Sequence, residues 1–332
     1  MPRRDKALIS ASTKADHIVC ISANPALDRR VRLESLKIGE VNRAASGESF
    51  GGGKAAHVAM AALALGAQPT WIGFLGGATG EECAAKLRGL GLEVLPVALQ
   101  SPTRLNLEIL HDHGTVTEIL EPGHPPGAVA MQEFTRTLVE TLQTDLNGAP
   151  VSISGSLPAG MPSDFFASLA RHANSQRSPV FLDTSGAALA QSLAAKPALV
   201  KINRDEARQL LQSPINNPAD ALNAARQIID RGAQSAAVTL GGDGIIWLES
   251  KEGPAWLATP PKLKPVSTVG SGDTTLAGFV LASMRGFNSE NTIRFAAACG
   301  AANCLAPIPG AIQRSAVDAL QNQITVTKLA SA

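Results

Sequence analysis

The sequence is poor in cysteine, in charge of one sign and in long apolar runs, and each shortage excludes a class of protein. Its four cysteines, Cys20, Cys83, Cys299 and Cys304, are too few and too scattered for a disulfide framework, and no second Cys/His pair accompanies Cys299 and Cys304 to make a zinc site. Lys and Arg number 29 against 28 Asp and Glu, which leaves a formal charge of +1 and no basic excess for nucleic acid or an anionic membrane. No run approaches the roughly 18 apolar residues that a membrane span needs. We therefore expect a cytoplasmic protein whose partners are small molecules, with no nucleic acid and no membrane among them.

The composition favours a large folded core. Apolar residues make up 45% of the 332 residues and charged residues 17%, which excludes wholesale disorder. This length fits either about two domains or one large α/β domain with an insertion. Residues 1–16 are polar and lack the apolar core of a signal peptide, so we expect a disordered tail followed by one folded domain over residues 17–325.

Short β-rich runs alternate with longer helical ones along most of the chain. The expected strands are residues 17–22, 70–75, 151–154, 180–183, 199–203 and 236–240. The expected helices are residues 58–66, 80–90, 163–172, 219–231 and 272–284. Strands that alternate with helices of about ten or more residues form βαβ units, so the fold class is α/β with a central, mostly parallel sheet.

Two segments interrupt this alternation. Residues 31–50 and 104–121 alternate polar with apolar side chains and show little helical period. We expect them to form a small antiparallel sheet outside the main layer, placed as a lid over a cleft. The alternative is a pair of ordinary surface hairpins.

A glycine-rich turn at residues 51–54 suggests a site for a polar or anionic small molecule. It is not a P-loop, because Glu48 stands where that motif needs its first glycine and Ala55 stands where it needs Ser or Thr. What remains is a turn that opens a helix at about Lys54, with free backbone amides and one ammonium group. The alternative is a tight turn with no ligand.

A second glycine-rich turn, at residues 267–278, carries the best candidate for a general base. Gly270 and Gly272 precede an Ala/Leu-rich helix, and Asp273 lies in its first turn. Amides at a helix N-terminus stabilise negative charge that develops on a phosphoryl group. An Asp beside them can accept the proton of an attacking hydroxyl. The alternative is that Asp273 only caps the helix.

Two further stretches suit a nucleotide and its metal. Asn203 and Glu206 follow a strand and lie three residues apart, so both can face one direction and hold Mg²⁺ through water. The alternative is a capping pair at a helix start. Residues 237–244 run from a strand into a glycine turn where the backbone could approach phosphates, although the same pattern is common in plain hairpins.

Taken in order, eight motifs resemble those of the ribokinase-like (pfkB-type) carbohydrate kinases. The resemblance covers about residues 17–320, and its motifs are Asn-Pro-Ala-Leu-Asp (24–28), Gly-Gly-Lys-Ala-Ala-His (52–57), Thr-Arg-x-Asn (103–106), Thr-Glu-Ile-Leu-Glu-Pro-Gly (117–123), Ser-Gly-Ser-Leu-Pro-Ala-Gly (154–160), Asp-Thr-Ser-Gly (183–186), Lys-x-Asn-x-x-Glu (201–206) and Val-Gly-Ser-Gly-Asp-Thr (269–274). Each motif alone is weak, whereas eight in the family's order are specific.

The resemblance implies a three-layer ribokinase-like domain with a small β-sheet lid, and ATP-dependent phosphorylation of a sugar hydroxyl. It implies Asp273 as the base beside an anion hole at Gly270, Ser271 and Gly272. The implied sugar or sugar-phosphate contacts are Asp28, Arg43, Gly52, Gly53, Lys54, His57, Arg104 and Ser156. The implied ATP contacts are Lys201, Asn203, Thr239, Gly241, Gly244 and Asn303, and the implied Mg²⁺ site is Asn203 with Glu206 through water.

The branch resembled most is that of the hexose-phosphate kinases. Its implied acceptor here is fructose 1-phosphate, because the Thr-Glu-Ile stretch at residues 117–119 leans toward kinases of that sugar. The alternatives are fructose 6-phosphate, tagatose 6-phosphate, and an unphosphorylated sugar or nucleoside. A non-catalytic sugar-phosphate sensor is the alternative from another class. In this family the lid often pairs with a partner's lid, which implies a homodimer.

Five positions depart from the patterns of the family or its branches. Ala55 replaces a glycine, and His57 replaces an asparagine that touches sugar. These two changes leave the identity of the sugar open, but they do not alter the expectation of phosphoryl transfer. The alternative for His57 is a packed core residue. Ile202 and Ser271 are minor changes, whereas Glu118 stands where the kinases of fructose 6-phosphate carry a phosphate-binding arginine.

Overall fold

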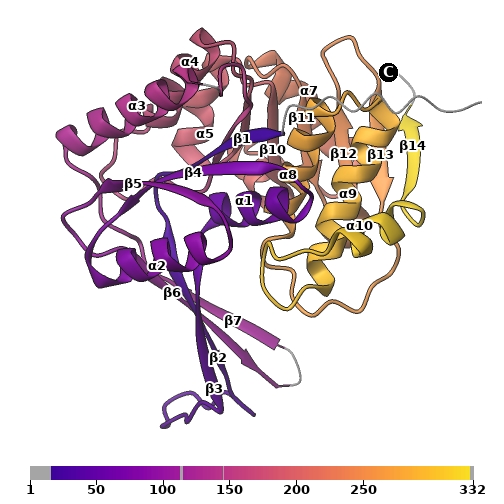
Figure 1. The fold of residues 1–332 in the computed structure, drawn as a ribbon. Coiled ribbons are helices and arrows are strands. Elements are labelled where there is room, and N and C mark those ends of the chain that lie inside the picture. The colour runs from indigo at the N-terminus through magenta and orange to yellow at the C-terminus, as the bar shows by residue number, and fades with distance from the viewer. Residues whose placement is uncertain (1–15, 113–114, 145, 330–332) are drawn as a thin grey trace, which may run out of the picture.

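The computed structural model describes residues 16–112, 115–144 and 146–329, so the tail expected over residues 1–16 lies outside it except for Asp16. Figure 1 shows a large twisted sheet with helices on both faces, and a small sheet that stands out from one side. The predicted α/β fold with a central sheet and a small separate sheet is confirmed.

The large sheet has ten strands in the order β14-β13-β12-β11-β10-β9-β8-β1-β4-β5. From β5 to β11 every neighbouring pair is parallel, and β12, β13 and β14 extend the edge in antiparallel fashion. The strand bounds are β1 His17–Ser22, β4 Gln68–Leu75, β5 Glu93–Ala98, β8 Val151–Ser154, β9 Val180–Asp183, β10 Leu199–Asn203, β11 Ala236–Thr239, β12 Ile245–Leu248, β13 Ala255–Thr259 and β14 Thr325–Leu329. The strand order reverses between β1 and β8, and ligands of open α/β sheets bind outside the carboxyl ends of the strands at such a reversal.

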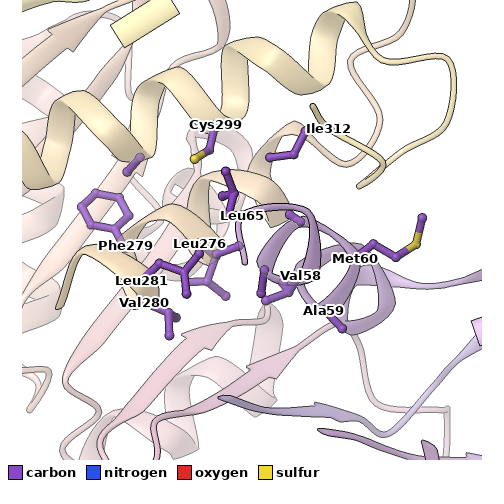
Figure 2. Close-up of a cluster of buried hydrophobic side chains, with 14 of the residues drawn as sticks. Val58, Ala59, Met60, Leu65, Leu276, Phe279, Val280, Leu281, Cys299 and Ile312 are labelled. Carbon is purple, nitrogen blue, oxygen red and sulfur yellow. The ribbon is translucent and has the colours of Figure 1, made fainter. Parts of the chain in front are cut away.

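Helices cover both faces of this sheet and enclose two hydrophobic cores. One layer is α1 Lys54–Ala64, α2 Gly77–Gly89, α8 Ser271–Met284, α9 Ser289–Leu305 and α10 Arg314–Gln321. The other is α3 Ala128–Gln143, α4 Phe165–Ser175, α5 Gly186–Ser192, α6 Arg204–Leu211 and α7 Pro218–Asp230. Figure 2 shows the first core, where Val58 and Ala59 of α1 lie near Leu276 and Val280 of α8. A Cβ on Gly278 would lie 2.7 Å from Ala296 Cα, so this glycine permits the close crossing of α8 and α9.

The small sheet contains β2 Ala26–Arg32, β3 Ser46–Gly52, β6 Arg104–His111 and β7 Thr115–Leu120 in the order β3-β2-β6-β7. It is not purely antiparallel as predicted, because β2 and β6 pair in parallel. Residues 33–45 also form no strand, since the Asn42 side chain bonds both the amide and the carbonyl of Lys37 and closes a local turn. Whether this sheet moves as a lid stays a prediction.

All the strands and helices expected in the large layer are present: β1, β8, β9 and β10 have the expected bounds, and the other elements have shifted ends. Helix α1 begins at Lys54, as predicted from the glycine-rich turn and four residues before the start expected from hydrophobic periodicity, because Gly53 with φ of 88° allows the chain to turn there. Strand β5, the antiparallel edge strands and helices α3, α5, α9 and α10 were not predicted. The chain has no tyrosine, and its three tryptophans, Trp71, Trp247 and Trp256, all lie in strands of the large sheet. Within the described residues, no helix is both long and apolar enough to span a membrane.

Candidate active site

A cavity of about 440 Å³, the first cavity, opens where the carboxyl ends of the parallel strands meet the small sheet. The large sheet contributes polar residues at or just after the carboxyl ends of β1, β8, β9, β10 and β11, namely Asn24, Ser156, Ser185, Asn203 and Thr239. The small sheet contributes Asp28, Asn106, Glu108 and Glu118. The cavity therefore lies at the strand-order reversal, where a ligand site is expected.

The N-terminus of α8 points into this cavity and carries the predicted base. Gly270 is the N-cap, with φ of 81°, and Asp273 lies in the first turn with a side chain 7% exposed. A Cβ on Gly272 would lie 2.7 Å from the Lys201 ammonium nitrogen, so the missing side chain makes room for that charge. The Ser271 amide is already bonded to the Thr268 carbonyl at 3.2 Å. An anion at this turn would thus meet the helix N-terminus and a buried lysine together.

His57 joins two acids across the cavity wall. Its Nδ1 lies 2.8 Å from Asp273 Oδ2, and its Nε2 lies 3.6 Å from Asp28 Oδ2. Burial lowers the pKa of His57, but the hydrogen bond to Asp273 and the nearby carboxylate of Asp28 outweigh it and raise the pKa to about 10. This raised pKa favours the protonated form of His57 at neutral pH. His57 is buried, as its alternative reading required, yet its contacts are polar.

Lys54, Lys201, Asp183 and Glu206 form a charged cluster beside the α8 N-terminus. Lys54 Nζ lies 2.9 Å from Asp183 Oδ1 and 3.2 Å from Glu206 Oε1, while Lys201 Nζ pairs with Asp183 Oδ2. Burial lowers the pKa of Lys54, but the charges of Asp183 and Glu206 raise it by more, so that it lies well above its ordinary value. Burial raises the pKa of Asp183, yet the two lysines hold it below its ordinary value. Lys54 therefore faces the side of the cavity toward β10 and α6.

Asn203 and Glu206 form a capping box at the start of α6. Asn203 Oδ1 accepts from the amides of Asp205 and Glu206, both at 2.9 Å, and Glu206 Oε2 accepts from the Asn203 amide at 2.8 Å. The alternative given for this pair is therefore present in the structure. Both side chains also line the first cavity, and no group of three His, Cys, Asp or Glu in the described ranges could grip a metal directly. These residues fit Mg²⁺ only through water, because their oxygens are already shared with backbone amides or Lys54.

A second cavity of about 560 Å³ adjoins the first on the other side of the α8 N-terminus. Thr239 and Gly272 line both cavities. The predicted ATP contacts Gly241 and Gly244, together with Ser271, line the second cavity beside apolar residues of the 260–265 segment and α9. An apolar slot that joins a polar cavity at a helix N-terminus suits the base and the phosphates of a nucleotide.

The predicted sugar contacts converge on Asp28. Its Oδ1 accepts from Asn106 Nδ2 at 2.8 Å, and its Oδ2 lies 3.4 Å from the Gly53 amide. A Cβ on Gly52 would lie 2.0 Å from Asp28 Oδ2, so only glycine fits beside this carboxylate. Ser156 accepts a hydrogen bond from Asn24 at 3.2 Å and lines the same cavity.

Arg104 lines the first cavity, but much of its guanidinium is already bound. It donates to the carbonyls of Asn24, Pro25 and Glu121 at 2.8–3.4 Å. Burial lowers the pKa of Arg104, although Asp28 and Glu121 oppose that shift. Of the five N–H donors of an arginine, some therefore remain for a substrate anion while others fix the chain after β1.

Three predicted contacts, Arg43, Gly52 and Asn303, line neither cavity, although Gly52 lies against the Asp28 carboxylate. Arg43 is exposed in the loop between β2 and β3, far along the small sheet. Asn303 is buried, and it donates to the Val269 carbonyl at 2.7 Å and accepts from the Gly310 amide at 2.8 Å. Asn303 thus fastens the turn before α8 to the 307–310 segment.

The sequence analysis assigned no role to three other residues of this site. Asp183 pairs with both lysines, Asn106 orients Asp28, and Asn24 bridges Ser156 to the Pro122 carbonyl. Each lies inside a motif that was recognised, so the signal was present. Their partners come from distant parts of the chain, which spacing alone does not show.

Comparison with known proteins agrees with this geometry. The pfkB family of carbohydrate kinases matches residues 16–312. The chain is 31% identical to 1-phosphofructokinase of Vibrio cholerae, over 94% of this chain and 97% of that protein. It is 34% identical to 1-phosphofructokinase of Xanthomonas campestris, over 80% of this chain and 83% of that protein. Its fold is similar to the tetrameric inhibited form of phosphofructokinase-2 from Escherichia coli, with a TM-score of 0.85 and 27% identity over 93% of this chain and 99% of that one.

Proposed function

Because the chain belongs to the pfkB family of carbohydrate kinases, we propose that it transfers the γ-phosphoryl group of ATP to a hydroxyl of fructose 1-phosphate, giving fructose 1,6-bisphosphate. The resemblance drawn from the eight motifs is confirmed. One observation carries the proposal: Asp273 stands at the N-terminus of α8 in the first cavity, and Gly272 beside it lines both cavities. A hydroxyl held in the first cavity thus meets a phosphoryl group that enters from the second.

The proposed transfer uses groups that are already placed. Asp28 and its partner Asn106 hold sugar hydroxyls, and the remaining donors of Arg104 bind the phosphate of the substrate. Asp273 takes the hydroxyl proton as that oxygen attacks the γ-phosphorus of ATP, and the bond from this phosphorus to the bridging oxygen breaks to release ADP. The α8 N-terminus and Lys201 stabilise the charge in transit. Mg²⁺, when bound, neutralises phosphate charge, and Asn203 and Glu206 would hold it through water.

The direct test is a coupled ADP-release assay with ATP and Mg²⁺ on a panel of acceptors. The panel holds fructose 1-phosphate, fructose 6-phosphate, tagatose 6-phosphate, free fructose and a nucleoside. We expect turnover with fructose 1-phosphate, and a loss of about 10²- to 10⁴-fold in kcat for Asp273→Asn, measured on a variant that circular dichroism shows to be folded. Near-normal turnover of that variant would remove Asp273 as the base. Silence of the wild type on every acceptor would favour a sugar-phosphate sensor.

A kinase of an unphosphorylated sugar is the second candidate, and the binding of Arg104 to three main-chain carbonyls is the observation that favours it. The same panel separates the two. Turnover confined to free fructose or the nucleoside would keep Asp273 and the fold but discard the phosphate contact.

We also propose a homodimer through the small sheet. Ile38, Val41, Ile119 and Leu120 are 95%, 78%, 56% and 58% exposed on this sheet and its loop. Exposed apolar side chains such as these can be buried against a second molecule. Analytical ultracentrifugation should show a dimer that Ile119→Asp weakens, while Leu90→Asp, at an exposed apolar residue that caps the C-terminus of α2, leaves it intact. A wild-type monomer would refute this proposal. The cytoplasmic location stays a prediction.

A further inference from the structure

In the first cavity, the His57 side chain contacts both carboxylates that have a role in the proposed reaction. His57 lies on α1, between Asp28 on β2 and Asp273 on α8. Its side chain is 8% exposed, and that of Asp273 is 7% exposed. An ion pair with so little water is restricted in its geometry, because moving either partner would leave a buried charge unpaired.

The two oxygens of Asp273 differ in their surroundings. Oδ2 lies 2.8 Å from His57 Nδ1. Within the described residues, Asp273 Oδ1 has no hydrogen-bond partner. This atom is nevertheless accessible rather than buried, and the Asp273 side chain lines the first cavity. One oxygen is thus held by the protein while the other is open to the cavity.

We propose that His57 is a positioning residue for Asp273: its Nδ1–H holds Oδ2, so that Oδ1 is the atom that receives the proton of the substrate hydroxyl. This inference rests on the proposed function. In the step, the hydroxyl oxygen bonds to the γ-phosphorus, the bond from that phosphorus to the bridging oxygen breaks to leave ADP, and the proton passes to Oδ1. His57 keeps both of its ring protons throughout and contributes orientation and charge.

The backbone around His57 is fixed as firmly as its side chain. A Cβ on Gly310 would lie 2.7 Å from His57 Cα, and the Gly310 amide donates to Asn303 Oδ1 at 2.8 Å. Asn303 in turn donates to the Val269 carbonyl and to Ser271 Oγ at the start of α8. The chain of contacts through Asn303 therefore sets α1 and the α8 N-terminus relative to one another, which an arrangement of base and positioning residue requires.

Several charges bear on the titration of His57. Asp28 on β2, Asp273 on α8 and Glu118 on β7 favour its protonated form, while Lys54 on its own helix acts on the same Asp273. The 307–310 segment contributes backbone at this point. The imidazolium is a cation held against the base, and loss of such a cation disfavours the ionised form of a neighbouring carboxylate.

Two substitutions separate geometry from charge. His57→Asn places an amide nitrogen close to the position of Nδ1, so it keeps a donor toward Asp273 but loses the positive charge. His57→Leu loses both at similar volume. His172→Asn, an exposed position at the end of α4, is the matched control for the same change of residue type.

We expect His57→Leu to lose about 10²-fold in kcat or more, and His57→Asn to stay within about tenfold of the wild type, with the KM for ATP unchanged in both. In His57→Asn the acid limb of the kcat profile should move up by about one pH unit, because the cation beside the base is gone. His172→Asn should leave both the rate and the limb unchanged. An unchanged limb and rate in His57→Asn would overturn the proposal. Equal losses in both His57 variants with an unmoved limb would reduce His57 to a structural role and overturn it as well.

A second measurement does not depend on turnover. In an NMR titration of the imidazole nitrogens, the wild type should keep His57 doubly protonated at pH 8, and Asp273→Asn should lower the pKa of His57 by at least one unit. A neutral His57 at pH 8, or a titration that Asp273→Asn leaves unmoved, would refute the pairing even if no acceptor is turned over. A wild type that is silent on the acceptor panel refutes the proposed function instead, so the two failures are distinguishable.

Discussion

Removing the carboxylate of Asp183 tests the charged cluster most directly. Asp183 is fully buried and lies between Lys54 Nζ, at 2.9 Å, and Lys201 Nζ. The Lys201 side chain is 3% exposed, whereas that of Lys54 is 37% exposed and also has Glu206 as a partner. In Asp183→Asn, Lys201 keeps its position and loses its counter-charge.

The cost follows from the burial of Lys201. Removing one partner of a buried ion pair destabilises a protein by about 3–5 kcal/mol, because the other charge stays out of water. A total free energy of unfolding of about 5–15 kcal/mol would lose a large share. With an m-value of about 3 kcal/mol/M, the urea midpoint falls by about 1–1.7 M.

Urea unfolding followed by circular dichroism measures this loss. Asp230→Asn is the matched control, since Asp230 pairs with Lys251 at 2.7 Å on the surface and its loss should leave the midpoint unchanged. The pKa of Asp183 is held low in the folded state, so its stabilisation is present above the unfolded pKa of about 3.9 and is lost as pH falls further. The difference in urea midpoint between the wild type and Asp183→Asn should therefore decrease at acid pH. A midpoint within error of the wild type at pH 7 would refute the argument from burial.

Three other outcomes follow from the site. Gly52→Ala should raise the KM for the sugar acceptor at least about tenfold with the KM for ATP unchanged, because a Cβ 2.0 Å from Asp28 Oδ2 displaces that carboxylate. Gly127→Ala is the control, since a Cβ there meets nothing within 4 Å. An unchanged acceptor KM in Gly52→Ala would contradict a sugar contact at Asp28. Arg104→Ala should raise the KM for fructose 1-phosphate and not that for free fructose, and equal effects on the two would assign Arg104 to the fold alone. The pKa of His57 is raised to about 10, so the stabilisation of the fold by protonated His57 is full below about pH 6.5 and is lost toward pH 10. Urea unfolding at pH 6, 8 and 10 should show that the wild type is more stable than His57→Asn at pH 6 and that this difference disappears by pH 10. A difference that stays constant with pH would contradict the pairing of His57 with its acids.

The order of elements was predictable because the large sheet is built from short β-rich runs between helices. Residues 18–21 and 180–182 are apolar throughout, as strands buried on both faces must be. Helix α3 was missed although Phe134, Leu138 and Leu142 recur every four residues on its buried face. Helix α9 was missed because it is buried nearly all round and shows no amphipathic period.

The motifs predicted which segments form the site, and the fold decided what each side chain does there. Asp273 and Asp28 lie in one cavity as expected. Each comes shortly after a turn of the chain, and both turns lie at the edge of the large sheet where the cavity opens. Asn303 could not be placed from sequence, since its partners Val269 and Gly310 meet it only when α9 packs against α8. The bond between His57 and Asp273 joins residues 216 positions apart, and no local pattern encodes it.

The placement of the aromatic residues has an optical consequence. With no tyrosine in the chain and all three tryptophans in strands of the large sheet, ultraviolet emission excited at 295 nm reports on that sheet alone. The small sheet is dark at this wavelength, and a single tryptophan introduced at the exposed Ile119 of β7 would give it a signal of its own against a fixed background. Stopped-flow fluorescence of that variant, mixed with the sugar acceptor, would then test the prediction that the small sheet moves as a lid.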